Sequence, residues 1–187
     1  MKQINIPTKR GSVLNGVLFH AADSDTVVIS ITGIHGNFYS NPFYYNFGDT
    51  LNAGGVDFIY AQTNDAFGQI QTYNANTGKE EIIGSWNERF EYTDEDIEAY
   101  LDYVESAGYK HIILAGHSLG ANKVIYYLSR HHDARVEHFI FLSPANLSHM
   151  MSSVTDREKE FVRRQVEWGF LSYIQNNTYG CVVNRHI

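Results

Sequence analysis

The sequence predicts an α/β protein with a mostly parallel sheet that is covered by helices on both faces. Short hydrophobic, β-branched runs alternate with amphipathic segments, which is the order expected of repeated strand–helix units. The run 26–31 (TVVISI) is apolar at nearly every position, as is typical of a strand buried on both faces. A length of 187 residues suits one such domain, so we expect a single domain over residues 1–187.

The expected elements begin with a hairpin and continue as strand–helix units. The turn-like sequence Lys9-Arg10-Gly11 separates two short runs with strand character, 3–6 and 12–20, which favours a hairpin. Further strands, all expected to be buried, are predicted at 26–31, 56–61, 111–115 and 136–142. Helices are predicted at 42–53, from 93 to about 107, and at 119–130.

Helix boundaries rest on local capping signals. Gly54-Gly55 and Gly108 are expected to end the first two helices, because glycine readily adopts the left-handed conformation found there. Thr93 and Asp96 have the spacing of a capping box, in which the threonine hydroxyl caps the first helical turn. The second helix is therefore expected to begin at Thr93.

Two segments do not fit the regular alternation. Residues 62–92 form a long connection rich in Asn, Gly, Thr and Gln, which is typical of a lid or binding loop, with a small hairpin expected at 69–73 and 80–83. Residues 149–176 are expected to form a helical cap or a terminal helix. The last residues are ambiguous, with 181–183 as a candidate short strand.

Composition excludes several classes of function. Hydrophobic residues make up 43% of the chain and charged residues 19%, as in globular proteins. The formal net charge of −7 argues against nucleic acid or an anionic membrane surface as a partner. No apolar run approaches the roughly 18 residues of a membrane span, and the N-terminus lacks the apolar core of a secretory signal. We therefore expect a soluble, cytoplasmic protein.

The sequence also lacks the patterns that hold cofactors. Cys181 is the single cysteine, so neither a disulfide framework nor a cysteine-based metal site is expected. No P-loop, dinucleotide-binding fingerprint or metal-ligand cluster occurs. We therefore expect no cofactor and no metal.

The motif Gly116-His117-Ser118-Leu119-Gly120 carries the strongest chemical signal. It lies where a predicted strand passes directly into an amphipathic helix. A sharp turn at this point holds a serine in a strained conformation and projects its hydroxyl from the carboxyl edge of the sheet. The flanking glycines allow the strand and helix backbones to pass close together. The amide of Leu119 then lies at a helix N-terminus, where it can stabilise a developing oxyanion.

At these residues the chain resembles the esterase and lipase branch of the α/β-hydrolase superfamily, over roughly residues 13–145. The resemblance implies that Ser118 is the nucleophile and that a second oxyanion donor follows the earlier buried strand, within Thr32 to Asn37. If Gly33 matches the glycine of the family, the donor is the Ile34 amide. If His35-Gly36 is the matching pair, it is the Asn37 amide. We favour Ile34, which is closer to the strand end.

The acid and the histidine of a catalytic triad are not evident. The family places them after two later strand–helix units, which need roughly sixty residues, and only 45 follow Leu142. His186 occupies a suitably late position and His149 could approach the site, but both are weak candidates; His35 and His117 suit packing or substrate contact better. Two explanations stay open: a truncated hydrolase, which we favour, or a compact one whose tail departs from the family pattern. Truncation would expose a sheet edge and favour homo-oligomers.

The leading hypothesis is a serine hydrolase that cleaves small carboxylic esters through an acyl-enzyme at Ser118. Within the same class, a thioesterase or an acyltransferase is an alternative. From another class, a catalytically silent α/β-hydrolase-like binding module would explain the missing acid and base. The aromatic segment 37–47 either lines a substrate pocket or packs in the core, and the second interpretation is favoured.

Overall fold

The computed structural model of the chain describes residues 1–147 and 154–160. The chain divides into two compact units, Met1–Pro144 and Ala145–Ile187, and the first contains every labelled strand and helix. In the second unit, residues 156–160 are helical. Most of the cap or terminal helix expected at 149–176, and the candidate strand at 181–183, lie outside the described residues. The single domain over 1–187 stays a prediction.

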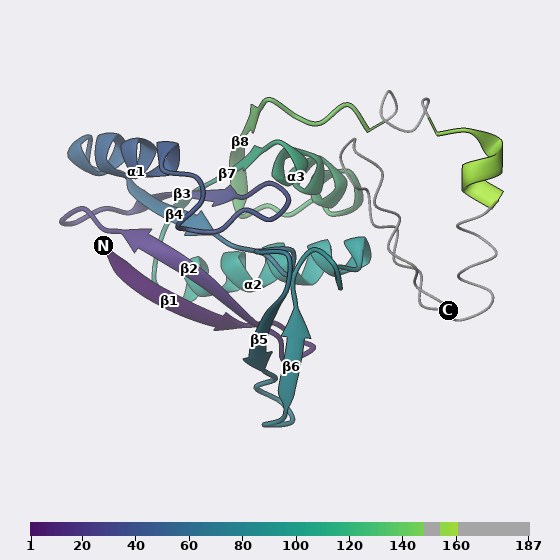
Figure 1. Cartoon of the computed structure of the whole chain (residues 1–187). Coiled ribbons are helices and arrows are strands. Elements are labelled where there is room, and N and C mark those ends of the chain that lie inside the picture. Colours follow the sequence, from purple (N-terminus) through teal and green to yellow (C-terminus); the bar gives the residue numbers. More distant parts are fainter. Residues whose placement is uncertain (148–153, 161–187) are drawn as a thin grey trace. The chain divides into compact units, whose positions relative to one another are not determined.

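A six-stranded sheet forms the centre of the first unit (Figure 1). Its strand order is β1-β2-β4-β3-β7-β8. The pairs β1–β2 and β2–β4 are antiparallel, whereas β4–β3, β3–β7 and β7–β8 are parallel. The prediction of a mostly parallel sheet that opens with a hairpin is therefore confirmed. The strands are β1 (Lys2–Pro7), β2 (Val13–Phe19), β3 (Thr26–Ile31), β4 (Asp57–Ala61), β7 (His111–His117) and β8 (Val136–Leu142).

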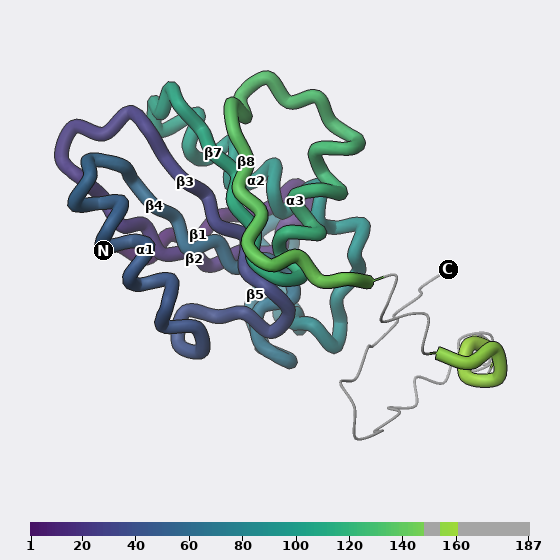
Figure 2. The backbone as a smooth tube through the Cα atoms, turned by 90° about the horizontal axis from the view of Figure 1, so that it is seen from above, coloured from purple at the N-terminus to yellow at the C-terminus, as the bar shows by residue number. Residues whose placement is uncertain are grey.

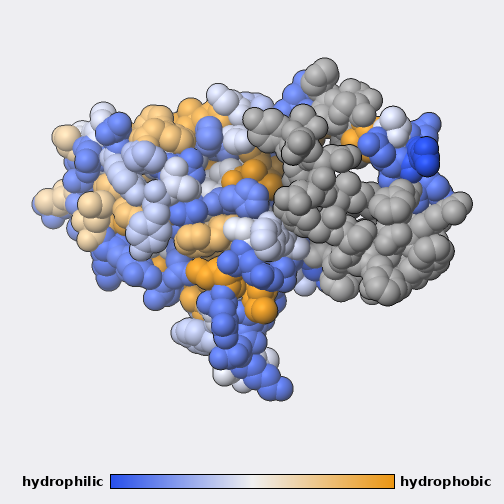
Figure 3. All heavy atoms as spheres, viewed as in Figure 1, coloured by the Kyte–Doolittle hydropathy of each residue, from blue (hydrophilic) through white to orange (hydrophobic). Residues whose placement is uncertain are grey.

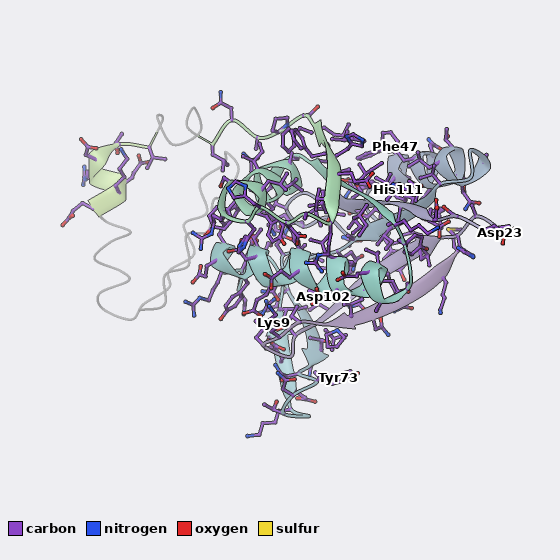
Figure 4. All side chains as sticks on the ribbon, turned by 180° about the vertical axis from the view of Figure 1, so that it is seen from behind. Lys9, Asp23, Phe47, Tyr73, Asp102 and His111 are labelled. Carbon is purple, nitrogen blue, oxygen red and sulfur yellow. The ribbon has the colours of Figure 1, made fainter. Side chains whose placement is uncertain are left out.

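Helices cover both faces of this sheet, as predicted. Val27, Ile29 and Ile31 of β3 share one buried cluster with α2 and α3, whereas Val28 belongs to a second cluster with α1. This division follows from the alternation of side chains along a strand. Phe47 of α1 and Asp102 of α2 accordingly lie on opposite sides of the sheet (Figure 4). The helices are α1 (Phe43–Ala53), α2 (Thr93–Ser106) and α3 (Leu119–Arg130).

The long connection 62–92 contains the predicted hairpin, formed by β5 (Ile70–Tyr73) and β6 (Glu80–Ile83). Its turn is organised by Asn74, whose side-chain oxygen accepts hydrogen bonds from the amides of Asn76 and Thr77. The hairpin projects from the sheet, and its tip is hydrophilic (Figure 3). The connection continues through the 3₁₀ turn η1 (Phe90–Tyr92) into α2.

Strand β8 differs from its prediction. We expected a buried strand, yet most of its side chains are exposed, including Phe139 at 58% and Ile140 at 43%. The reason is its position at the edge of the sheet, because among the described residues it pairs with β7 alone (Figure 2). An apolar run shows that a strand forms, but not which elements pack against it. Self-association through this edge stays a prediction.

Helix α2 begins at Thr93, as predicted, but Thr93 does not cap it. Thr93 already has helical backbone angles, φ −52° and ψ −41°, because the 3₁₀ turn runs directly into the helix. The N-cap position is therefore Tyr92, and no side chain caps it. The capping-box interpretation was wrong. The carboxylate of Asp96 instead accepts the amide N–H of Asn64 at 2.8 Å.

None of the helices in the described ranges has both the length and the apolar character needed to cross a bilayer.

Candidate active site

Ser118 forms the turn between β7 and α3 by itself, since the strand ends at His117 and the helix begins at Leu119. Its backbone angles are φ 55° and ψ −124°, which a residue with a side chain rarely adopts. Two backbone hydrogen bonds stabilise this conformation, one to the end of β8 and one within the first turn of α3. The amide of Ser118 donates to the Leu142 carbonyl at 3.0 Å, and the Ser118 carbonyl accepts the Ala121 amide at 3.1 Å.

Two glycines make this turn possible. A Cβ atom at Gly116 would lie 2.5 Å from the carbonyl oxygen of Gly120. A Cβ atom at Gly120 would lie 2.5 Å from the carbonyl oxygen of Thr32, and closer still to that of Ile31. The close approach expected from the motif is therefore present between α3 and both β7 and the end of β3. No other residue type fits either position without moving backbone.

The strain at Ser118 leads to a stability prediction. We expect Ser118→Gly to raise the free energy of unfolding by about 1 kcal/mol or more, because glycine adopts this conformation without the cost that a side chain imposes. Denaturant unfolding of both proteins measures the difference. Ser118→Ala is the matched control, since it removes the hydroxyl but retains the Cβ atom, and its stability should stay close to that of the wild type. Equal stabilities for the glycine and alanine variants would contradict strain at this turn.

The loop after β3 lies against Ser118. A Cβ atom at Gly33 would be 3.1 Å from the Cβ of Ser118 and 3.5 Å from its Oγ, so the Gly33 backbone directly adjoins the serine side chain. The next amide along the chain is that of Ile34. The Asn37 amide donates to the Ser40 hydroxyl at 3.3 Å and is therefore already engaged. These contacts favour Ile34 over Asn37 as the second oxyanion donor, and the assignments of Ile34 and Leu119 stay predictions.

The two histidines that were expected near the site, His117 and His35, have other contacts. His117 packs edge-on against Phe43, with ring centroids 5.0 Å apart, and burial lowers the pKa of its imidazole. The Nδ1 of His35 lies 2.6 Å from the Ser85 hydroxyl and 3.2 Å from the Phe67 carbonyl oxygen. Both arrangements are those of packing or positioning residues.

No base for Ser118 is identified among the described residues. Within residues 1–147 and 154–160, no hydrogen bond involves the Ser118 hydroxyl. His149 and His186, the candidates from the sequence, both lie outside the described residues. The same part of the chain holds no group of three or more His, Cys, Asp or Glu side chains that could bind a metal ion.

The aromatic segment 37–47 mostly packs in the core, in agreement with the favoured interpretation. Phe38, Phe43, Tyr44 and Tyr45 belong to the cluster between α1 and the sheet, whereas Tyr39 is 81% exposed. A cavity of about 400 Å³ adjoins this segment, but its lining comes from β1, β2, Phe38, Tyr39 and the long connection and does not include Ser118.

Sequence reasoning missed a buried charged group in α3. Lys123 is 1% exposed and lies on the same buried face as Gly120, Val124 and Tyr127. A lysine on the apolar face of a predicted helix is a usable signal, because a buried charge requires a buried partner. The partners, Asp65 and Glu88, come from the long connection and could not be identified from spacing.

Comparison with known proteins identifies the family. A family model described as the alpha/beta hydrolase fold matches residues 62–178, which is more than half of the chain. The chain therefore belongs to the alpha/beta hydrolase family, as the resemblance at the Ser118 motif predicted. No curated protein matches the chain.

Solved structures share this fold at low sequence identity. Est1E from Butyrivibrio proteoclasticus is 20% identical with a TM-score of 0.62, over 83% of this chain and 56% of that one. The alpha/beta hydrolase GrgF from Penicillium sp. sh18 is 15% identical with a TM-score of 0.64, over 95% and 60%. The Pyrococcus furiosus esterase Pf2001 is 16% identical with a TM-score of 0.60, over 87% and 62%. The chain thus spans less than two thirds of the length of each.

Proposed function

We propose that this protein is a serine hydrolase that cleaves small carboxylic esters through an acyl-enzyme at Ser118. The observation that carries the proposal is the strained Ser118 turn, enclosed by Gly116 and Gly120 and adjoined by the backbone of Gly33. A strand-to-helix turn of this kind exposes the serine hydroxyl at the carboxyl edge of the sheet. The likeness to Pf2001, an esterase, supports the ester class.

In the proposed reaction, Oγ of Ser118 attacks the ester carbonyl carbon and its proton passes to a general base. The carbonyl oxygen becomes an oxyanion that accepts hydrogen bonds from the amides of Leu119 and Ile34. Collapse of this intermediate breaks the ester bond, and the alcohol leaves with the proton. Water then attacks the acyl-serine, which releases the carboxylic acid and regenerates Ser118. His149 and His186 are the candidates for the base.

The type of acyl group transferred is a matter for substrate screening. A structure of Est1E contains bound ferulic acid, so aromatic acyl esters belong in the screen beside short aliphatic ones. Thioesters and alcohol acceptors in the same screen separate a thioesterase or an acyltransferase from an ester hydrolase, because all three share the acyl-enzyme.

Labelling with a fluorophosphonate tests the proposal. The reagent phosphonylates an activated serine, so we expect the folded chain of 187 residues to gain one adduct, located on Ser118 by peptide mass spectrometry. Ser118→Ala should gain none and should lose all turnover of p-nitrophenyl acetate. If the folded wild-type chain is not labelled, the proposal fails and a silent binding module is favoured. That alternative is motivated by the acid and the base of a catalytic triad, which are not evident in the sequence.

A further inference from the structure

A buried charged cluster joins α3 to the long connection 62–92. The ammonium of Lys123 lies 2.9 Å from the Asp65 carboxylate and 2.5 Å from that of Glu88. It also donates to the Thr63 hydroxyl at 3.1 Å. The exposed fractions of Lys123, Asp65 and Glu88 are 1%, 0% and 13%, so these contacts are largely shielded from water. The cluster therefore attaches both ends of the connection to the helix that begins at Leu119.

The same connection holds the loop that follows β3. The Ser85 hydroxyl lies 2.6 Å from Nδ1 of His35, and the Phe67 amide donates to the His35 carbonyl at 3.3 Å. Ala66 forms an isolated parallel bridge with His35. The left-handed φ of His35, 58°, is unfavourable for a residue with a side chain. Contacts from the connection therefore stabilise a backbone conformation that the loop would not adopt by itself.

Short chain segments link these two sets of contacts. Asp65 is followed directly by Ala66 and Phe67, and Ser85 lies three residues before Glu88. His35 is the residue after Ile34, whose amide lies next to Gly33 and thus beside Ser118. A continuous series of contacts therefore runs from Lys123 on α3 to the backbone of His35, through Asp65 and Phe67, and to its imidazole, through Glu88 and Ser85.

We propose that the Lys123 cluster and residues 62–92 act as a brace, which fixes the Ile34 amide relative to Ser118 and so positions the oxyanion site. The inference rests on the proposed function, because it assigns the Ile34 amide a role in that reaction. The two proposed oxyanion donors lie on separate elements, Leu119 on α3 and Ile34 on the loop after β3. A rigid connection between these elements keeps both amides directed at one point, as preorganised oxyanion stabilisation requires.

The chemistry of the cluster suits this role. Burial raises the pKa of Glu88 to about 7, and the positive charge of Lys123 opposes that rise. Asp96, which is also buried, accepts the Asn64 amide and an Arg10 guanidinium N–H at 2.5 Å. Charged hydrogen bonds have stricter geometry than apolar contacts, so they fix the path of the connection more narrowly than packing alone.

Two variants test the brace. Ser85→Ala removes the hydroxyl that contacts His35 and leaves the charges intact. Glu88→Gln removes one carboxylate charge from the cluster and keeps the shape of the side chain. We expect each to lower the second-order rate of fluorophosphonate labelling at Ser118 about tenfold, as a small displacement of a catalytic group does. We also expect faster amide hydrogen exchange at residues 33–37, measured by mass spectrometry.

The double variant and two controls make the test specific. Because both changes act through one brace, the labelling rate of the double variant should fall by a much smaller factor than the product of the two single-variant factors. Ser85→Thr keeps the hydroxyl and should retain most of the labelling rate. Asp57→Asn alters a buried carboxylate at the start of β4, which accepts the Ala21 amide at 2.7 Å. It should lower stability without changing the labelling rate or the exchange at 33–37.

The outcomes separate the brace from the proposed function. A wild-type chain that is not labelled refutes the serine hydrolase, whereas the exchange measurement still tests the brace. Unchanged exchange at 33–37 in both folded variants overturns the brace whatever the labelling shows. Equal losses of labelling in Asp57→Asn and Ser85→Ala, in proportion to lost stability, would also overturn it.

Discussion

Gly120→Ala is expected to destabilise the fold by about 3 kcal/mol or more, the upper range for overpacking. The new Cβ atom would lie 2.5 Å from the carbonyl oxygen of Thr32 and closer still to that of Ile31. Both obstacles are backbone atoms at the end of a central strand, so they cannot rotate away as a side chain would. The first turn of α3 would have to shift, and the Leu119 amide would move with it.

Urea unfolding followed by circular dichroism measures this loss. Gly54→Ala is the matched control, because Gly54 also adjoins a helix end but has φ −86° and its Cβ would lie 3.3 Å from the Leu51 carbonyl. We expect that control to change stability by about 1 kcal/mol or less. A similar loss of stability in the two variants would show that the close approach of α3 to β3 does not restrict position 120 to glycine.

Lys123→Met is expected to lower the free energy of unfolding by about 3–5 kcal/mol, because it leaves buried carboxylates without their counter-charge. Asp65 is fully buried and Glu88 nearly so, and their carboxylates both contact the lysine. Without Lys123 the pKa of Glu88, already raised to about 7 by burial, should rise further. A carboxyl whose pKa is higher in the folded state than in the unfolded state destabilises the fold above its unfolded pKa. The difference in free energy of unfolding between the wild type and Lys123→Met should therefore be larger at about pH 8 than at about pH 5.

Unfolding measured at both pH values tests this expectation. The triple variant Lys123→Met, Asp65→Asn, Glu88→Gln removes all three charges, and we expect it to recover much of the stability that the single variant loses. Lys110→Met is the surface control, because Lys110 is 73% exposed and lies 3.5 Å from Asp25, so its loss should stay below about 1 kcal/mol. A loss for Lys123→Met as small as for Lys110→Met, or one independent of pH, would contradict a charged cluster.

The central strands and their helices were predictable because their signals are local. An apolar, β-branched run such as 26–31, bounded by turn residues, favours a strand in a chain of strand–helix units. The Ser118 turn was predictable for the same reason, since two glycines at fixed spacing between a strand and a helix permit a close backbone approach. The small hairpin β5–β6 also follows from turn residues adjacent in sequence.

Two errors have a common origin in contacts between distant segments. The apolar run of β8 was expected to be buried, yet burial depends on neighbours that a run of residues does not specify. Thr93 and Asp96 have the spacing of a cap, yet the preceding 3₁₀ turn and the Asn64 amide determine their roles. A local sequence pattern predicts which secondary structure a segment forms, whereas contacts with distant segments determine its burial and the hydrogen bonds of its side chains.

The sequence by itself determined the α/β class, the position of the serine turn and the loop that lies against it. All three depend on interactions within a few residues or on a side-chain period that any strand or helix must obey. Only the tertiary structure decided that Lys123 is buried against Asp65 and Glu88, and that Ser85 contacts His35. These contacts join residues far apart in the chain, and their geometry exists only after the sheet and helices have assembled.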